Sequence, residues 1–363
     1  MRSSLLPLIG VLGVLGGSVV AGPWAVTGAG RGDGGFGQSG IVRTDFGGDD
    51  QLNAVAIQSD GKILVAGSSG SMDFQSSMFA LARYESDGTL DRSFGIGGKL
   101  LTAFGSQTPN YLGAVVVQTD GKIVAAGTSA GHVGLVRYER NGDIDQGFGR
   151  AGYVRTAFPV FEVSTVAIQT DGKIVAAGWT EKTFALARYT SNGSLDKSFG
   201  SGGKVVTYFG QMSGADDLAI QRDGKIVVAG AETDPSPRFV LARYTPGGRL
   251  DPTFGSRGKI LSRFGGAFAI ERDGKIITVG SAAGASGNSP MCVLVRYTAN
   301  GILDTSFGPQ GKMMTYVGHA FTGIAAVAIQ YDGKIVGGGG GSRLAGHRDF
   351  LLVRFNPGGS LDR

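Results

Sequence analysis

The sequence predicts an all-β protein made of six repeats, each folding into a sheet of four antiparallel strands. An Asp-Gly-Lys motif followed by a short apolar run occurs six times, first as "DGKILVAG" at residue 60. Between the motifs lie short runs rich in Val, Ile, Phe and Tyr, separated by Gly, Asn and Asp, which is typical of strands and turns. The 65 Gly and 11 Pro among 363 residues fit a turn-rich β protein and exclude collagen, which needs Gly at every third position.

The first residues predict a secretory signal peptide. Arg2 supplies positive charge, an apolar run covers Leu5 to Val20, and Val19-Val20-Ala21 is a small-residue cleavage site. We therefore expect a signal peptide at 1–21, a linker at 22–35, and a repeat domain at 36–363 that is secreted, periplasmic or at the cell surface. A retained anchor is the alternative, but the run is short of the roughly 20 apolar residues of a span, and no later segment resembles one.

Charge and cysteine content argue against a nucleic-acid-binding protein and against a protein stabilised by disulfides. The net charge is +5, yet the lysines recur singly beside Asp and Gly instead of clustering with aromatic residues, so we expect no nucleic-acid partner. The single cysteine, Cys292, cannot form an internal disulfide. Stability must then come from burial and strand pairing.

Each repeat of 50 to 60 residues contains four predicted strands. In the first repeat these are residues 52–58, 62–68, 78–84 and 99–104. The Asp-Gly pair between the first two predicts a two-residue hairpin turn of the primed type. The third strand ends in Arg and an aromatic residue, as in "FALARY" at 79, and is followed by an acidic turn such as "LDRSFG" at 90. Four antiparallel strands repeated radially predict a six-bladed β-propeller.

The chain ends predict how the ring closes. The sixth repeat stops at "GGSLDR", before a fourth strand, whereas "GDGGFGQSGIVRTDFG" at 32–47 contains a Phe-Gly turn and a strand. We predict that residues 41–46 pair beside residues 350–355, so that the N-terminal strand completes the last blade. This pairing would remove an open sheet edge.

The linked motifs "DGKIVAAG", "LARY" and "LDKSFG" of residues 171–200 resemble the bacterial delta-60 repeat family, and the resemblance covers about residues 36–363. It implies a secreted or surface propeller, similar in strand logic to NHL-type propellers. It implies no established reaction. The sixth repeat departs most, with "GGGGGSRLAGHRD" after its second strand, and the second repeat has Tyr153 where others have Lys.

The recurring charged residues have structural explanations beside functional ones. The six DGK aspartates could form a ring of carboxylates that binds a cation. The structural alternative is that each Asp accepts a hydrogen bond from the backbone of its hairpin turn and each Lys is solvated. We expect each recurring Arg to bind the Asp of its own turn, because a charge near packed sheets needs a partner. The recurring Phe is expected to anchor neighbouring blades. The first strand of each repeat ends in Gln, except in the fifth repeat, where it ends in Glu271. These side chains could form a polar ring in a central channel or make hydrogen bonds within the turns.

Function is expected in the loops that do not repeat, because they gather at the other end of the blades, near the channel mouth. Candidate ligand-binding residues, chosen by position and chemistry, are Asn53, Trp179, Asp216, Asp217, His319, Arg343 and His347. We identify no catalytic and no metal-binding residues. Calcium is considered because propeller hydrolases gather carboxylates where the first strands begin, but only one blade offers them there.

The sequence therefore predicts an exported binding or scaffolding module for an extracellular protein or glycan, of undetermined oligomeric state, without a cofactor. The alternative is a propeller hydrolase or lyase, lactonase-like or glycosidase-like, acting on sugar or lactone substrates. The sequence has no G-x-S-x-G elbow, no H-E-x-x-H motif and no P-loop. It leans towards binding rather than catalysis.

Overall fold

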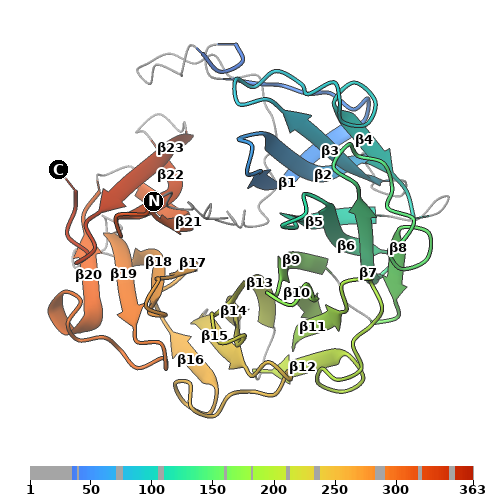
Figure 1. The fold of residues 1–363 in the computed structure, drawn as a ribbon. Helices are drawn as coiled ribbons and strands as arrows, with labels where there is room; N and C mark the ends of the chain where they lie inside the picture. The colour runs from blue at the N-terminus through green and yellow to red at the C-terminus, as the bar shows by residue number, and fades with distance from the viewer. Residues whose placement is uncertain are drawn as a thin grey trace, which may run out of the picture. The chain divides into compact units, whose positions relative to one another are not determined.

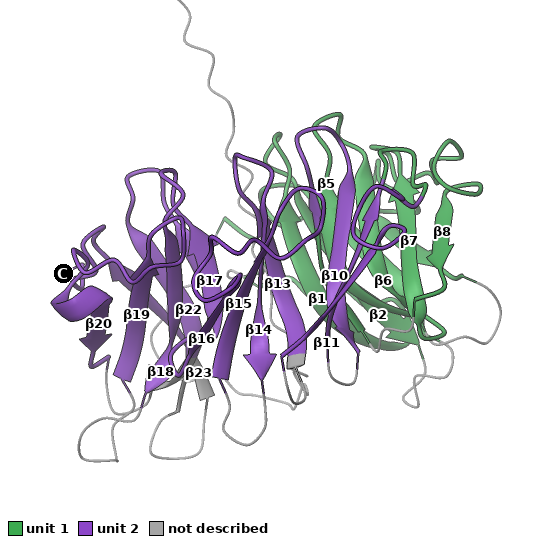
Figure 2. Ribbon diagram, turned by 90° about the horizontal axis from the view of Figure 1, so that it is seen from below, with its two compact units in different colours: residues 1–166, 190–194 green, residues 167–189, 195–363 purple. Residues whose placement is uncertain are grey.

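The computed structural model is all-β and divides into two compact units (Figures 1 and 2). It describes residues 35–38, 41–70, 77–104, 110–158, 162–180, 183–209, 213–232, 238–282, 291–317, 321–342 and 348–362. Unit 1 comprises residues 1–166 and 190–194, and unit 2 comprises 167–189 and 195–363. The predicted signal peptide and nearly all of the predicted linker lie outside the described residues.

Unit 1 contains two four-stranded sheets. The first sheet has the strands β1 (Asp49–Ile57), β2 (Ile63–Gly70), β3 (Met78–Tyr84) and β4 (Lys99–Thr102). The second has β5 (Asn110–Val117), β6 (Ile123–Ser129), β7 (His132–Tyr138) and β8 (Tyr153–Thr156). Strands pair in chain order, so each sheet is an antiparallel meander. The four strands predicted for the first repeat are confirmed.

The third sheet contains the boundary between the units, which falls within β9. Its strands are β9 (Glu162–Ile168), β10 (Ile174–Thr180), β11 (Thr183–Tyr189) and β12 (Lys204–Tyr208). The other sheets of unit 2 repeat the same order. The fourth sheet has β13 (Ser213–Ile220), β14 (Ile226–Glu232), β15 (Arg238–Tyr244) and β16 (Lys259–Ser262). The fifth has β17 (Ala267–Ile270), β18 (Ile276–Ala282), β19 (Met291–Tyr297) and β20 (Lys312–Thr315), with a 3-10 turn η1 (Pro309–Gly311) before β20.

The sixth sheet has three strands, β21 (Phe321–Ile329), β22 (Ile335–Ser342) and β23 (Arg348–Phe355). Among the described strands β23 pairs only with β22, so the predicted pairing of residues 41–46 with 350–355 is not among the pairings that the structure describes. Residues 42–46 form no strand, and they turn to the first sheet instead, where the Lys99 ammonium group donates to the Asp45 carbonyl at 2.9 Å. No sheet is closed into a ring by the strands that the structure describes.

Apolar side chains fill the space between successive sheets. In unit 1, Leu64, Phe79, Leu81 and Leu112 belong to one buried cluster that joins the first sheet to the second. Unit 2 has equivalent clusters between its successive sheets. The predicted Phe anchors are confirmed, because the recurring phenylalanines are fully buried: Phe94, Phe148, Phe199, Phe254 and Phe307.

Each sheet has two different ends. The turn end carries the Asp-Gly turns between the first and second strands and the Gly-containing turns that follow the third strand. The loop end carries the connections between the second and third strands and between sheets. In the first turn Gly61 has φ +85° while Asp60 keeps a negative φ, and the Gln58 N–H donates to the Lys62 carbonyl at 2.8 Å. A type I turn followed by a left-handed Gly fits this pattern, so the predicted primed turn is wrong.

Candidate functional site

The turn end of every sheet holds an arginine–aspartate ion pair, as predicted. In each, the Arg Nε lies between 2.5 and 2.9 Å from an Asp Oδ2. The pairs are Arg83–Asp91, Arg137–Asp145, Arg188–Asp196, Arg243–Asp251, Arg296–Asp304 and Arg354–Asp362. The first five guanidinium groups also lie over the ring of the recurring Phe, 4.5 to 4.6 Å from its centroid. A group held on so many sides is not available to a ligand.

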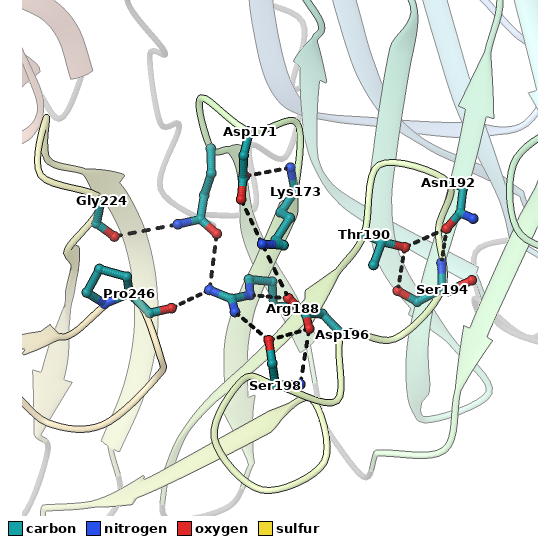
Figure 3. A network of polar contacts seen from close by, with 11 residues as sticks. Asp171, Lys173, Arg188, Thr190, Asn192, Ser194, Asp196, Ser198, Gly224 and Pro246 are labelled. Atoms are coloured by element: carbon teal, nitrogen blue, oxygen red, sulfur yellow. Dashed lines mark hydrogen bonds and ion pairs between the residues drawn. The ribbon is translucent and has the colours of Figure 1, made fainter.

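Arg188 shows the complete arrangement (Figure 3). Its Nε donates to Asp196 at 2.9 Å, its Nη2 to the Ser198 hydroxyl at 3.3 Å, and its Nη1 to the Pro246 carbonyl of the following sheet. Arg188 is 4% exposed. Burial raises the pKa of the Asp196 carboxyl, but hydrogen bonds from Ser198 and the charge of Arg188 outweigh burial, and the net pKa is lowered. The pair therefore stays charged at neutral pH.

The DGK aspartates cap their turns, as the structural interpretation predicts. In all six, Asp Oδ1 accepts a hydrogen bond from the N–H of the Lys two residues on, at 3.0 to 3.1 Å. The expectation that each Lys is simply solvated is wrong. Lys62 lies 2.8 Å from Asp91, and Lys122 lies 2.8 Å from Asp145, so these lysines join the buried ion pairs. Sequence spacing gives no signal of this contact, because it joins residues of different turns.

The polar residue that ends each first strand also faces the turn end. The Gln169 Nε2 lies 3.5 Å from the Gly224 carbonyl, and the Gln221 Nε2 lies 3.5 Å from the Gly274 carbonyl. The Gln169 Oε1 accepts from Arg188 at 3.4 Å. These contacts favour the turn interpretation over a ring of free amides.

Glu271 is the one acid at this position, and burial raises its pKa, an effect that the charge of Arg296 opposes. An acid with a raised folded-state pKa destabilises the fold as pH rises past its unfolded value of about 4.3. We expect Glu271→Gln to raise the free energy of unfolding by about 1 kcal/mol at neutral pH and to have no effect near pH 3. Denaturant titrations at both pH values measure this. Gln221→Glu, the reverse change, should destabilise only at neutral pH, and equal effects at both pH values would contradict the explanation.

The loop end is positioned by a β-bulge in the first strand of the sheet. The register of the first strand shifts at extra residues in four sheets. These are Asn53, Gly113 and Asp216 and, in β21, both Thr322 and Ala325. Bulges bend a strand and redirect a side chain, and they are over-represented next to active sites. Two predicted site residues, Asn53 and Asp216, are thus bulge residues, a feature that the sequence pattern did not reveal.

The bulges also explain the last Gly of the repeated motif. In the fourth sheet, a Cβ on Gly230 would lie 1.7 Å from the Gly214 carbonyl oxygen that the bulge pushes towards it. Gly67 and Gly127 meet the same obstacle, at 1.9 and 2.0 Å. The glycine therefore accommodates the bulge.

The predicted site residues have different surroundings. The Asn53 Nδ2 donates to the Leu112 carbonyl of the second sheet at 2.7 Å, so one side of its amide is structural. The Asp217 Oδ1 accepts from the next backbone N–H at 2.8 Å. Trp179, on β10, lies against β13, where a Cβ on Gly214 would be 3.5 Å from its indole Cγ. Unit 2 thus brings Trp179 close to the bulge that carries Asp216.

His319, Arg343 and His347 lie outside the described residues. Among the residues that the structure describes, no group of three or more His, Cys, Asp and Glu could hold a metal ion. Cys292 is fully buried, and burial raises the pKa of its thiol to about 12, so it is not a reactive nucleophile. No helix in the described part of the chain has the length and apolar character needed to cross a membrane.

A family model of a β-propeller domain of unknown function, DUF5122, matches residues 58–94, 118–148, 169–199, 221–254, 271–307 and 330–363. No curated protein matches the chain.

Among solved structures, three similar chains have TM-scores below 0.5. The β-propeller domain of the Trilobed protease from Pyrococcus furiosus has a TM-score of 0.43 and 10% identity over 85% of this chain and 81% of its own. A protein of unknown function from Dyadobacter fermentans has a TM-score of 0.46 and 8% identity, over 85% of this chain and 95% of its own. The polysaccharide lyase Uly1 has a TM-score of 0.45 and 12% identity, over 85% of this chain and 78% of its own.

Proposed function

The chain belongs to the DUF5122 β-propeller family, and from this premise we propose that it is an exported module that binds a ligand at the loop ends of its sheets. The ligand would be an extracellular glycan or protein, and the repeats would be those of the delta-60 family. The location would be periplasmic, secreted or at the cell surface, after removal of residues 1–21.

The contrast between the two ends of the sheets carries this proposal. The turn ends are nearly identical in every repeat, and their charged groups are used in ion pairs within the protein. The loop ends differ in length and chemistry from repeat to repeat. A rigid repeated scaffold with variable loops is the arrangement that binding proteins use.

We also propose that the six sheets form a closed six-bladed ring, in which residues 41–46 supply the missing strand of the sixth sheet. In unit 1, the Gly37 N–H donates to the Asp87 carbonyl at 2.7 Å, as the Gly95 N–H does to the Asn141 carbonyl at 2.8 Å. Gly95 precedes the fourth strand of the first sheet, so the matching contact of Gly37 supports a similar role for residues 41–46.

In unit 2, the exposure of Leu352 supports the same ring. It is 78% exposed, whereas Leu241 and Leu294, at the same repeat position, are fully buried. We expect Leu352→Cys to react slowly with a thiol reagent in the folded chain, at a rate near that of the buried Cys292. Rapid labelling of the folded variant, with Leu101→Cys on an exposed edge strand as the reactive control, would argue for an open chain.

The alternative function is a hydrolase or lyase with sugar or lactone substrates. The observation that favours it is the adjacent pair Asp216 and Asp217, of which Asp216 is the exposed bulge residue of β13. Two neighbouring carboxylates would serve a divalent ion such as calcium only with further oxygen ligands from other loops.

Metal content and calcium-dependent thermal stability of residues 22–363 separate the two functions. For the binding module we expect no stoichiometric ion and no calcium-dependent change in Tm, and Asp217→Asn should leave Tm unchanged. A stoichiometric calcium ion that raises Tm would favour the enzyme if Asp217→Asn abolishes both the binding and the rise in Tm. At a hundredfold excess over Kd, such binding stabilises the fold by about 2.7 kcal/mol. Asp223→Asn, in a turn, is the matched control.

A further inference from the structure

The second and third strands of a sheet meet at the loop end through one pair of opposite residues. In the third sheet this pair is Thr180 and Thr183, whose hydroxyl oxygens lie 2.7 Å apart. In the fourth sheet it is Glu232 and Arg238, whose charged groups lie 3.0 Å apart. This position therefore lets the two side chains bond directly to each other.

In the second sheet the same position is taken by Ser129 on β6 and His132 on β7. The Ser129 side chain is fully buried, and its Oγ has no hydrogen-bond partner among the described residues. The His132 Nδ1 is also buried without such a partner, although the residue as a whole is partly exposed. A buried polar atom left without a hydrogen bond costs about 1–3 kcal/mol. The two residues lie opposite each other on paired strands, the arrangement in which the Thr180 and Thr183 hydroxyls of the third sheet bond to each other.

We propose that His132 is a ligand-contacting residue, held by Ser129. When the Ser129 hydroxyl donates to Nδ1, the neutral imidazole carries its proton on Nε2. The exposed edge of the ring then presents Nε2–H as a fixed hydrogen-bond donor at the loop end of the second sheet. Such a donor recognises an oxygen acceptor, such as a hydroxyl or carboxylate oxygen of a glycan. This inference rests on the proposed binding function.

The neighbouring contacts support a rigid position for this pair. Asn110 lies opposite Ser129 on β5, and its Nδ2 donates to the Ser77 carbonyl at 2.9 Å while its N–H donates to the Ser77 hydroxyl at 3.0 Å. Ala130 and Gly131 form the tight turn between the strands, with φ of +46° and +73°. A donor at the start of a strand, next to so short a turn, loses little conformational entropy when a ligand binds.

The tautomer of His132 tests the pairing without any ligand. At about pH 8, where imidazole is ordinarily neutral, 15N-detected spectra of the labelled protein should show a protonated Nε2 and an unprotonated, hydrogen-bonded Nδ1. Ser129→Ala should shift the ring towards a mixture of tautomers, whereas Thr180→Ala should leave the His132 signals unchanged. A protonated Nδ1 in the wild type, or no change in Ser129→Ala, would overturn the pairing.

An array of neutral and uronic-acid oligosaccharides tests the contact with a ligand. For glycans that the wild type binds, His132→Ala should weaken binding at least tenfold, and Thr183→Ala should not. Wild-type binding that His132→Ala leaves intact would overturn this inference while leaving the binding function in place. If the wild type binds no glycan on the array, the glycan-contacting role fails whatever the tautomer.

Discussion

Gly230→Ala is expected to lower the free energy of unfolding by about 3–5 kcal/mol, the range of severe single substitutions. The added methyl carbon would lie 1.7 Å from the Gly214 carbonyl oxygen and 2.8 Å from the ring of Phe184. The obstacle is backbone of the neighbouring strand, so the clash cannot be relieved by turning a side chain. The bulge at Asp216 would have to move, and chemical denaturation of the variant measures the loss.

Gly338→Ala is the matched control, because it makes the same change in the second strand of another sheet. A Cβ there meets only Leu352, at an ordinary contact distance of 3.5 Å. Four other repeats already have Ala at this position: Ala66, Ala126, Ala177 and Ala229. We expect Gly338→Ala to be neutral or to stabilise by up to about 1 kcal/mol, since Ala restricts the unfolded chain. Similar losses in both variants would mean that strand glycines are generally needed, not that the bulge requires Gly230.

Arg188→Ala is expected to lower the free energy of unfolding by about 3–5 kcal/mol at neutral pH, because it leaves the buried Asp196 charge without its partner. The loss should shrink in acid. The pKa of Asp196 is lowered in the folded state, so the pair contributes stability that is present above the unfolded pKa of about 3.9 and is lost as pH falls through the folded value. Thermal unfolding at several pH values gives both results.

Arg354→Ala tests the importance of burial in this effect. Arg354 has the same position and the same Asp partner, but its side chain is 51% exposed, against 5% for Arg188. An exposed pair contributes only about 0–1 kcal/mol. A large loss in Arg354→Ala would show that this arginine is buried in solution, as a closed ring requires.

Much of the scaffold could be predicted from the sequence because its signals are local. The strands of the first repeat follow from apolar runs between turn residues, and Asp60 acts on a backbone N–H two residues away. The Arg188–Asp196 pair also joins residues eight positions apart, close enough for a repeated spacing to reveal it.

The features that sequence could not predict depend on contacts between distant segments. The Lys62–Asp91 ion pair joins two turns 29 residues apart. The need for Gly230 arises from a neighbouring strand that bulges, and a periodic apolar pattern contains no information about a bulge. The predicted pairing of residues 41–46 with 350–355 joins the two ends of the chain, and it stays a proposal.

The hydrogen bonds of the recurring Arg Nη1 atoms to backbone carbonyls run from one sheet to the sheet that follows it in the chain. Arg83, Arg188 and Arg243 each donate to a carbonyl that lies 56 to 58 residues later, in the following sheet. As the chain emerges during synthesis, a repeat can form its own Arg–Asp ion pair, but the Nη1 hydrogen bond of that arginine has to wait for the next repeat. A chain cut after any whole number of repeats should therefore end in one loosened sheet while the earlier ones keep their arginine contacts.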